Sequence, residues 1–221
     1  MIETVCGVVL RAEDLSEYDK RLTIYTRELG KLKAKVVGVK KAVSRLRGLA
    51  IPFSESRFQL YLHGTKRAGL HDPGKIVGGE LVRFHTVLRS DWEKMLQCNA
   101  VAEILDVLTR PFYPNADEYG LLSKTLDDME ETSSPLLVRL RFSLVLLKIL
   151  GYSLSHHPVW KSYSEKDREL LIGLGRWDMR ENKFTEYETV RMENIINAYL
   201  SNYLSRPLKT EVFQRKMALS A

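Results

Sequence analysis

Cations provide the clearest chemistry in this sequence. Between residues 31 and 47 the chain has seven basic residues and no acidic one. Positive charge at this density attracts polyanions, whereas a solvated surface would usually intersperse charges of both signs. The run therefore favours a nucleic-acid-binding segment. Its members are Lys31, Lys33, Lys35, Lys40, Lys41, Arg45 and Arg47.

The order of residues 31–36 predicts how three of these cations are presented. Lysines alternate there with Leu32, Ala34 and Val36, which is the period of a β-strand. Successive side chains of a strand point to opposite faces, so the lysines share one face and the apolar residues share the other. We expect a ladder of lysines on an outer surface, above an apolar core.

Four aromatic residues are interleaved with the basic residues: Tyr25, Phe53, Phe58 and Tyr61. Small barrels that hold single-stranded nucleic acid use such rings as stacking platforms beside a cationic phosphate track. Each ring is more often part of a barrel core. Tyr25 and Tyr61 are the better outward candidates, because a phenol tolerates a wet edge.

The elements that position these residues change type along the chain. The first third has five short β segments, which is typical of a small closed barrel. They lie near Val5–Val9, Leu22–Tyr25, Lys31–Val36 and Phe58–Leu62, and after the Asp72-Pro73-Gly74 turn as far as Val77. A short helical turn is expected at residues 44–49.

After Arg83 the apolar residues recur at helical spacing. The predicted helices cover Trp92 to Leu108, Tyr119 to Met129, the nearly all-apolar Leu136 to Leu150, and a stripe from Met192 to Tyr203. Gly173-Leu174-Gly175 is interpreted as a loop. The fold class is α+β, with an OB-fold nucleic-acid-binding domain at residues 1–80 and a helical partner-binding domain at residues 84–221.

The net charge of +6 supports this division. Residues 1–83 hold 16 Lys and Arg against 9 Asp and Glu, whereas residues 84–221 hold 18 against 19. The excess positive charge therefore belongs to the predicted barrel, as expected for a domain that binds a polyanion.

Catalytic motifs are missing from the sequence, so we expect a protein that is not an enzyme and needs no cofactor. Neither a phosphate-binding loop nor a dinucleotide fingerprint occurs. Cys6 and Cys98 are isolated, and His156-His157 lacks metal-ligand spacing, so we expect no metal and a surface or capping role for the histidines. The acidic residues 127–131 are interpreted as a solvated helix end. We find no signal peptide or membrane span, and expect a cytoplasmic, nucleoid-associated protein.

Several segments resemble the bacterial RecO recombination-mediator family. Residues 17–32 (EYDKRLTIYTRELGKL) resemble its opening signature, followed by VGVKK at 37–41, SRLRG at 44–48 and PF at 52–53. Arg141-Phe142 through Leu150-Gly151-Tyr152 resembles the central helix of the family, and Tyr203 to Lys209 its closing motif.

The resemblance implies an OB-fold followed by a helical bundle. It also implies binding of single- and double-stranded DNA, annealing of complementary strands, and help in loading RecA together with RecR. The helical domain would grip the acidic, phenylalanine-ended C-terminal tail of the single-stranded-DNA-binding protein. A zinc element of the family is not expected here, because Tyr152 to Tyr163 contains no cysteine.

Arg139 and Arg141 are the candidate cations for that tail. Both lie in an otherwise apolar helix, where an unpaired buried guanidinium would be costly. The alternatives are an internal ion pair with an acid such as Glu103 or Asp106, or a side chain that reaches the surface. Arg141 is favoured because it belongs to the Arg-Phe pair of the family pattern.

Two other functions stay open at this point. One is an RNA-binding OB module, and the more distant one is a metal-dependent phosphodiesterase built on the histidines and the acidic cluster.

Overall fold

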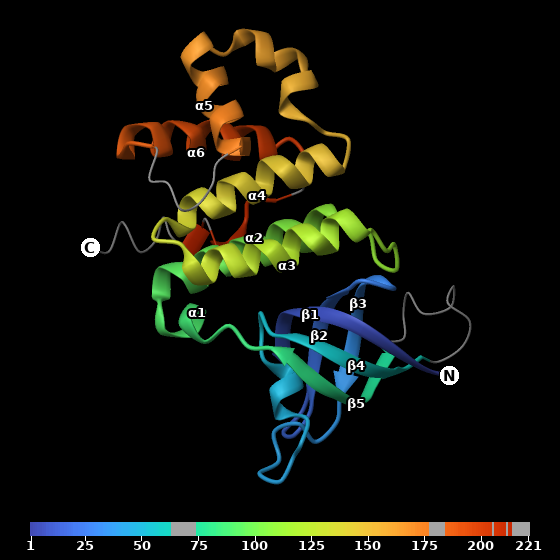
Figure 1. Cartoon of the computed structure of the whole chain (residues 1–221). Helices are drawn as coiled ribbons and strands as arrows, with labels where there is room; N and C mark the ends of the chain where they lie inside the picture. The colour runs from blue at the N-terminus through green and yellow to red at the C-terminus, as the bar shows by residue number, and fades with distance from the viewer. Residues whose placement is uncertain (63–73, 177–183, 205, 211, 214–221) are drawn as a thin grey trace. The chain divides into compact units, whose positions relative to one another are not determined.

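Five strands form the first part of the chain in the computed structural model, which describes residues 1–62, 74–176, 184–204, 206–210 and 212–213. They close a barrel in the order β1-β2-β3-β5-β4, the strand order of an OB-fold (Figure 1). Of the strand pairs that the structure describes, β3 and β5 are parallel and the other four are antiparallel. The strands are β1 Ile2–Asp14, β2 Lys20–Thr26, β3 Gly30–Val36, β4 Glu55–Tyr61 and β5 Gly74–Arg83. The predicted turn at Asp72 and Pro73 lies outside the described residues.

Alternation along the strands builds the barrel core. Leu32, Ala34 and Val36 of β3 are buried, and they pack with Leu22 and Ile24 of β2. The intervening residues of both strands therefore face outward, as the sequence predicts. A 3-10 turn, η1 (Arg47–Ala50), follows the loop after β3 and buries Leu49 and Ala50 against the same core.

After the barrel strands, the elements that the structure describes are helices, so the predicted α+β class is confirmed (Figure 1). Each predicted helix is present, and α1, α5 and two 3-10 turns are additional. The elements are α1 Thr86–Ser90, α2 Trp92–Leu108, α3 Ala116–Glu131, α4 Pro135–Ile149, η2 Leu154–His156, η3 Pro158–Ser162, α5 Glu165–Arg176 and α6 Glu186–Leu200. Within the described ranges, no helix combines the length and the apolar character that crossing a bilayer requires.

The loop predicted at residues 173–175 is wrong, because these residues belong to α5. Leu171 and Leu174 bury one side of this helix, and that burial outweighs the poor helix propensity of the two glycines. Gly175 faces open space, and a Cβ at Gly173 would make an ordinary contact with Phe184 at 3.7 Å. Neither position therefore requires glycine for lack of space or for a positive φ.

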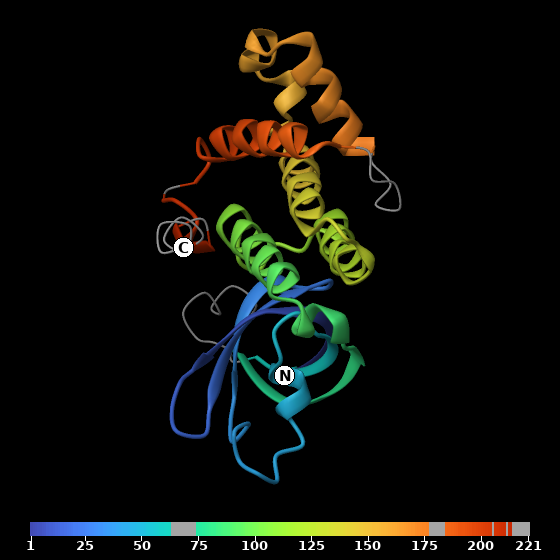
Figure 2. The ribbon, with the colours of Figure 1, turned by 90° about the vertical axis from the view of Figure 1, so that its left-hand side faces the viewer.

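The chain divides into two compact units, and the barrel unit is discontinuous in sequence. It comprises Met1–Thr86 together with Thr109–Tyr119, while Val87–Leu108 and Gly120–Ala221 form the helical unit. The inserted segment 109–119 lies directly against the barrel: the N–H of Phe112 donates to the carbonyl of Lys31 at 2.9 Å. At Gly30, where φ is +67°, a Cβ would lie 2.4 Å from the carbonyl oxygen of Tyr113. The close approach of this segment requires glycine there. Figure 2 shows the strands of the barrel in a view turned by 90° from that of Figure 1.

Candidate nucleic-acid interface

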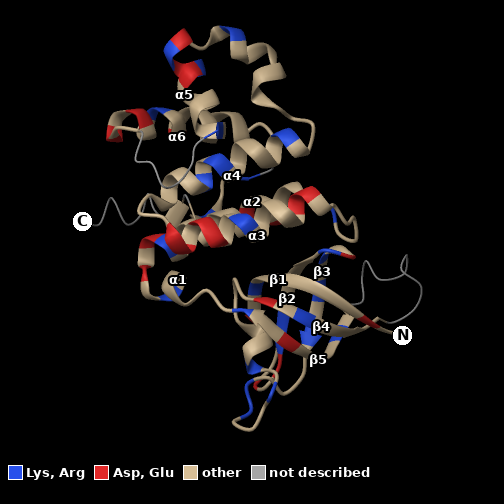
Figure 3. Cartoon of the chain, in the orientation of Figure 1, with Lys and Arg blue, Asp and Glu red and all other residues tan. Residues whose placement is uncertain are grey.

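Three cations from three neighbouring strands form one row on the outer face of the barrel. Arg21 of β2 is paired in register with Lys35 of β3, and Lys35 with Lys75 of β5. Neighbouring strands lie about 4.8 Å apart, so the row spans about 10 Å at the backbone. Lys33 lies two residues along β3 on the same face and is exposed. We call Arg21, Lys33, Lys35 and Lys75 the basic face; Figure 3 shows blue segments along these strands.

Lys31 does not belong to this exposed surface, although it faces outward from β3. Its ammonium donates to the carbonyl of Thr109 at 2.7 Å, and its residue is only 8% exposed. The prediction of a surface ladder is therefore wrong at Lys31 and correct at Lys33. Segment 109–119 covers the face there, and a local alternation pattern carries no information about such a distant segment. We remove Lys31 from the predicted DNA-binding set.

Tyr25, opposite Lys31 in the register, is covered by the same segment. It is fully buried, and its hydroxyl donates to the carboxylate of Glu118. Desolvation and the neighbouring carboxylate raise the pKa of Tyr25 above its ordinary value. The expectation of an outward platform at Tyr25 is wrong. Phe53 and Phe58 are core residues.

Of the four aromatic residues predicted from the sequence, Tyr61 is the one that reaches the surface beside the cations. It is paired with Lys75 in the register of β4 and β5, and it is 37% exposed. The row of cations therefore continues into a partly exposed ring, which is the combination of phosphate contact and base stacking that single-strand-binding barrels use.

A second group of cations lies in the loop after β3. Lys40, Lys41, Arg45 and Arg47 are all exposed, and we call residues 37–47 the basic loop. The ammonium of Lys41 lies 5.4 Å from the centre of the Tyr18 ring. Arg45 and Arg47 make no ion pair with any acidic side chain that the structure describes.

Two aspartates, one at the end of β1 and one in the β1–β2 connection, neutralise part of the charge of the basic loop and the basic face. Asp14 pairs with Lys40 at 3.0 Å, and Asp19 pairs with Lys35 at 3.3 Å. The hydrogen bond from Lys40 lowers the pKa of Asp14. The N–H of Gly38 lowers the pKa of Asp19, and Lys35 adds to that effect. The run from Lys31 to Arg47 is thus less cationic in the fold than in the sequence, because acids from outside it contact two of its lysines.

The residues considered for metal chemistry have structural roles instead. The ring of His157 accepts the N–H of Val159 at 3.3 Å and caps η3, so the predicted capping role is confirmed. Asp128 is buried and pairs with Lys124 and Arg141, so the interpretation of a fully solvated acidic helix end is wrong. Among the described residues, no group of three His, Cys, Asp or Glu side chains could hold a metal ion.

Arg139 is an internal structural residue of the helical unit. Its side chain is 2% exposed and contacts two other helices. Its Nε donates to Gln97 of α2 at 2.7 Å, and its terminal nitrogens donate to Asn197 and Glu193 of α6 at 3.2 and 2.6 Å. The peptide-binding role predicted for Arg139 is therefore wrong. The alternative, an internal ion pair, is correct, although its partner is Glu193.

Arg141 has a different environment two residues further along α4. Its side chain is 27% exposed and bonds Asp128 at 3.2 Å. Its Nε is buried and has no hydrogen-bond partner among the described residues. Arg141 shares a face of α4 with Leu144, Val145 and Lys148, because these positions follow the i, i+3, i+4, i+7 spacing.

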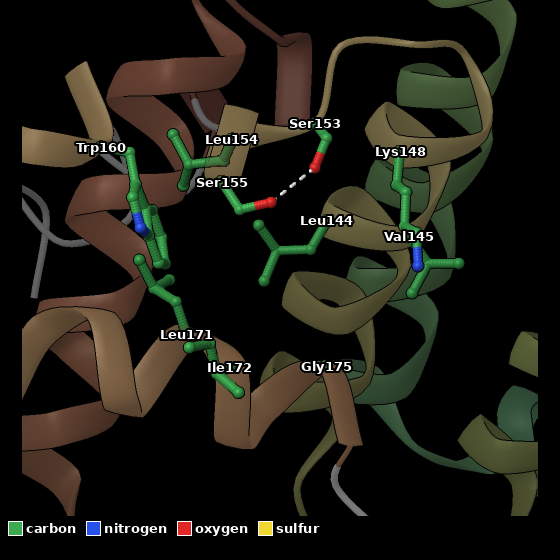
Figure 4. Close-up of a pocket in the computed structure, with 10 residues that line it drawn as sticks. All are labelled: Leu144, Val145, Lys148, Ser153, Leu154, Ser155, Trp160, Leu171, Ile172 and Gly175. Carbon is green, nitrogen blue, oxygen red and sulfur yellow. Dashed lines mark hydrogen bonds between the residues drawn. The ribbon is translucent and has the colours of Figure 1, made fainter. Parts of the chain in front are cut away.

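That face lines a pocket of about 250 Å³ within the helical unit. Figure 4 shows Trp160 and Leu171 on one side of it and Leu144 opposite, with Lys148 along α4 beside Val145. Leu154 and Ile172 complete the apolar lining, and the hydroxyls of Ser153 and Ser155 lie 3.0 Å apart in its wall. Pockets for drug-sized ligands hold about 300–1,000 Å³, so this one suits one or two side chains.

Comparison with known proteins identifies the family. The model for "Recombination protein O N terminal" matches residues 1–72, and that for "Recombination protein O C terminal" matches residues 89–157. The chain belongs to the RecO family. The DNA repair protein RecO of Pelotomaculum thermopropionicum is 37% identical over 146 residues, which cover 66% of this chain and 54% of that protein. The RecO proteins of Moorella thermoacetica and Listeria monocytogenes are 34% and 29% identical over 145 residues, 66% of this chain and 51% and 54% of theirs.

The matches thus span about half the length of these RecO relatives. The segment from Tyr203 to Lys209, read above as a closing motif, lies outside both family-model matches.

Sequence reasoning missed two members of the basic face and one residue of the pocket in the helical unit. Arg21 and Lys75 lie outside the basic run, and only strand pairing brings them beside Lys35. The alternation of Lys75 with Gly74 and Ile76 is a weak outward signal. Lys148 is the third: in the sequence it is one charge in a nearly all-apolar helix, and no local pattern indicated a pocket beside it.

Proposed function

We propose that this chain binds single- and double-stranded DNA through its barrel unit and anneals complementary strands. The observation that carries the proposal is the row of Arg21, Lys35 and Lys75 in register across an OB barrel, beside Tyr61. These cations would contact phosphates of any sequence and release condensed counterions. Membership of the RecO family supports DNA, rather than RNA, as the polyanion.

Annealing would follow from charge neutralisation. Two complementary strands repel each other through their phosphates, and a surface that contacts several phosphates lowers this repulsion. The basic face and the basic loop provide eight cations in one unit, counting Lys40, Lys41, Arg45 and Arg47. Base pairing would then supply the specificity, so the protein needs no hydrolysis and no cofactor.

Annealing of fluorescently labelled complementary oligonucleotides tests this function. The protein should accelerate annealing, and its affinity for DNA should fall steeply with salt because each phosphate contact adds about 0.7–0.9 to the slope. Matched DNA and RNA oligonucleotides separate the proposal from the alternative of an RNA-binding module. Tight binding to RNA with no acceleration of DNA annealing would contradict the proposal.

The helical unit would recruit the protein to DNA that is coated by the single-stranded-DNA-binding protein. We propose that the pocket beside α4 takes the aromatic C-terminal residue of that protein's tail, with Lys148 at the terminal carboxylate. Arg141 lies about two helical turns before Lys148 on the same face of α4. It would contact the acidic residues that precede the aromatic residue in the tail. Together with RecR, the chain would then help RecA to load, in association with the nucleoid.

Lys148→Ala and Arg141→Ala should each lower the affinity for a synthetic tail peptide by about 10-fold, since a charge-assisted hydrogen bond contributes about 1.5–3 kcal/mol. Titration calorimetry measures the loss. Lys161→Ala removes an exposed lysine outside the pocket lining and serves as the control. DNA affinity should stay unchanged in all three variants. Equal peptide affinities for Lys148→Ala and the wild type would place the peptide elsewhere.

A further inference from the structure

The basic loop carries an apolar residue at its apex. Val43 is 89% exposed, more than any other large apolar side chain that the structure describes. Single exposed apolar residues are common on protein surfaces and need no explanation by themselves. The setting of Val43 is different, because exposed cations precede and follow it two residues away, at Lys41 and Arg45.

The loop holds this apex in a defined place. Val39 is 3% exposed and anchors the first half of the loop in the barrel core. The N–H of Gly38 donates to Asp19 at 2.8 Å, and the N–H of Lys40 donates to the carbonyl of Tyr18 at 3.0 Å. A turn then closes between the carbonyl of Lys41 and the N–H of Ser44, at 3.0 Å.

The second half of the loop is also attached. Leu46 packs against the barrel core, and Leu49 of η1 is buried in it. The apex at Ala42 and Val43 is therefore supported from both sides, and Figure 2 shows the loop extending from the barrel. Valine is β-branched and stiff at χ1, so fixing its side chain against a ligand loses little conformational entropy.

We propose that Val43 is a wedge that contacts exposed base faces and separates neighbouring bases when the basic loop binds DNA. The inference rests on the proposed DNA binding. Lys41 and Arg45 would hold phosphates on either side, which brings the residue between them to the bases. Side chains such as Leu, Ile, Phe and Met insert between base steps in other DNA-binding proteins, where burial of the apolar group offsets lost stacking.

The wedge gives the chain a task that phosphate contacts alone cannot perform. Single strands form internal hairpins, which must open before complementary strands can pair. Neutralising phosphates stabilises a hairpin as well as the final duplex. A group that favours unstacked bases would shift the balance toward open strands, so Val43 should matter for structured strands and not for unstructured ones.

Val43→Thr tests the wedge, because threonine keeps the β-branched shape and replaces one methyl group by a hydroxyl. The readouts are the fluorescence of 2-aminopurine in a bound oligonucleotide, which rises on unstacking, and the annealing rate. Wild-type protein should raise the fluorescence. The variant should lose most of this rise and should anneal hairpin-forming strands about 10-fold more slowly, a change of the size expected for burial of a valine side chain.

Val37→Thr is the matched control, since Val37 is a 43% exposed valine of the same loop, away from the apex. Val37→Thr should show the fluorescence rise and the annealing rates of the wild type. Val43→Thr should anneal unstructured strands at a rate within about twofold of the wild type, because its cations are intact. Equal fluorescence and rates for Val43→Thr and wild type would overturn the wedge while leaving DNA binding in place. Wild-type protein that does not bind the oligonucleotides would overturn the proposed function and the wedge together.

Discussion

Arg139→Ala should lower the free energy of unfolding of the helical unit by about 3–5 kcal/mol, the cost of breaking a buried ion pair by removing one partner. The guanidinium joins α4 to Gln97 of α2 and to Glu193 and Asn197 of α6. Alanine would leave a cavity and three polar side chains without this partner, and the buried Gln97 would then lack its hydrogen-bond donor. Urea denaturation followed by circular dichroism measures the loss.

Arg141→Ala provides a control on the same helix. Arg141 is 27% exposed, and its partner Asp128 keeps an ion pair with Lys124 at 3.1 Å. We therefore expect a loss of about 1 kcal/mol or less. If Arg139→Ala and Arg141→Ala lowered the free energy of unfolding by similar amounts, the hydrogen bonds around Arg139 would stabilise the helical unit no more than the pair of Arg141 with Asp128 does.

A double variant separates the ion pair from the rest of the network. Arg139→Met with Glu193→Leu replaces both charges by apolar groups, and such replacements of buried pairs are often neutral or stabilising. The double variant should be more stable than Arg139→Met alone, which leaves Glu193 unpaired. If the loss of unfolding free energy in the double variant equals the sum of the losses in the two single variants, Arg139 contributes through packing and not through its pair with Glu193.

Removal of three cations from the basic face should lower DNA affinity by about 100-fold at 0.1 M salt. The variant is Arg21→Ala, Lys33→Ala and Lys75→Ala, which spares Lys35 because that lysine pairs with Asp19. Each lost phosphate contact on single-stranded DNA should lower the slope of log K against log salt by about 0.7, so the slope should fall by about 2. Fluorescence anisotropy over a range of salt concentrations measures both quantities.

A control variant that removes three positive charges from the helical unit distinguishes a DNA-binding site on the basic face from a general electrostatic attraction between the protein and DNA. Lys161, Lys166 and Arg176 are exposed cations of the helical unit, and their triple alanine variant is the control. It should keep the wild-type slope, with an affinity within about threefold, since distant charges are screened beyond about 10 Å at this salt concentration. Equal losses in the two triple variants would contradict a site on the basic face.

Local patterns predicted most of the fold. The period of two in residues 31–36 gave the outward and inward faces of β3 correctly, the period of 3.6 gave α2 and α6, and the long apolar run gave α4. These patterns work because burial of one face selects both the element and its orientation. The helix α5 was missed because Gly173 and Gly175 suggested a loop, while its stabilising contacts involve residues far away in the sequence.

The interface was less predictable, because it depends on which strands become neighbours. Arg21 and Lys75 join Lys35 only through the pairing of β2, β3 and β5. Lys31 leaves the surface because segment 109–119 covers it and the carbonyl of Thr109 accepts a hydrogen bond from its ammonium. Charge counts along the chain likewise could not reveal that Asp14 and Asp19 pair with Lys40 and Lys35.

The discontinuous barrel unit has a consequence for synthesis on the ribosome. All five strands have been made once residue 83 is added, yet Tyr25 and Lys31 then still lack Glu118 and Thr109. At about 5–20 residues per second, the missing segment follows about 2–7 s later. During that interval the nascent barrel exposes a tyrosine and a lysine that the mature protein buries. The α1–α2 stretch, which lies between the two parts of the barrel unit, therefore emerges before that unit is complete.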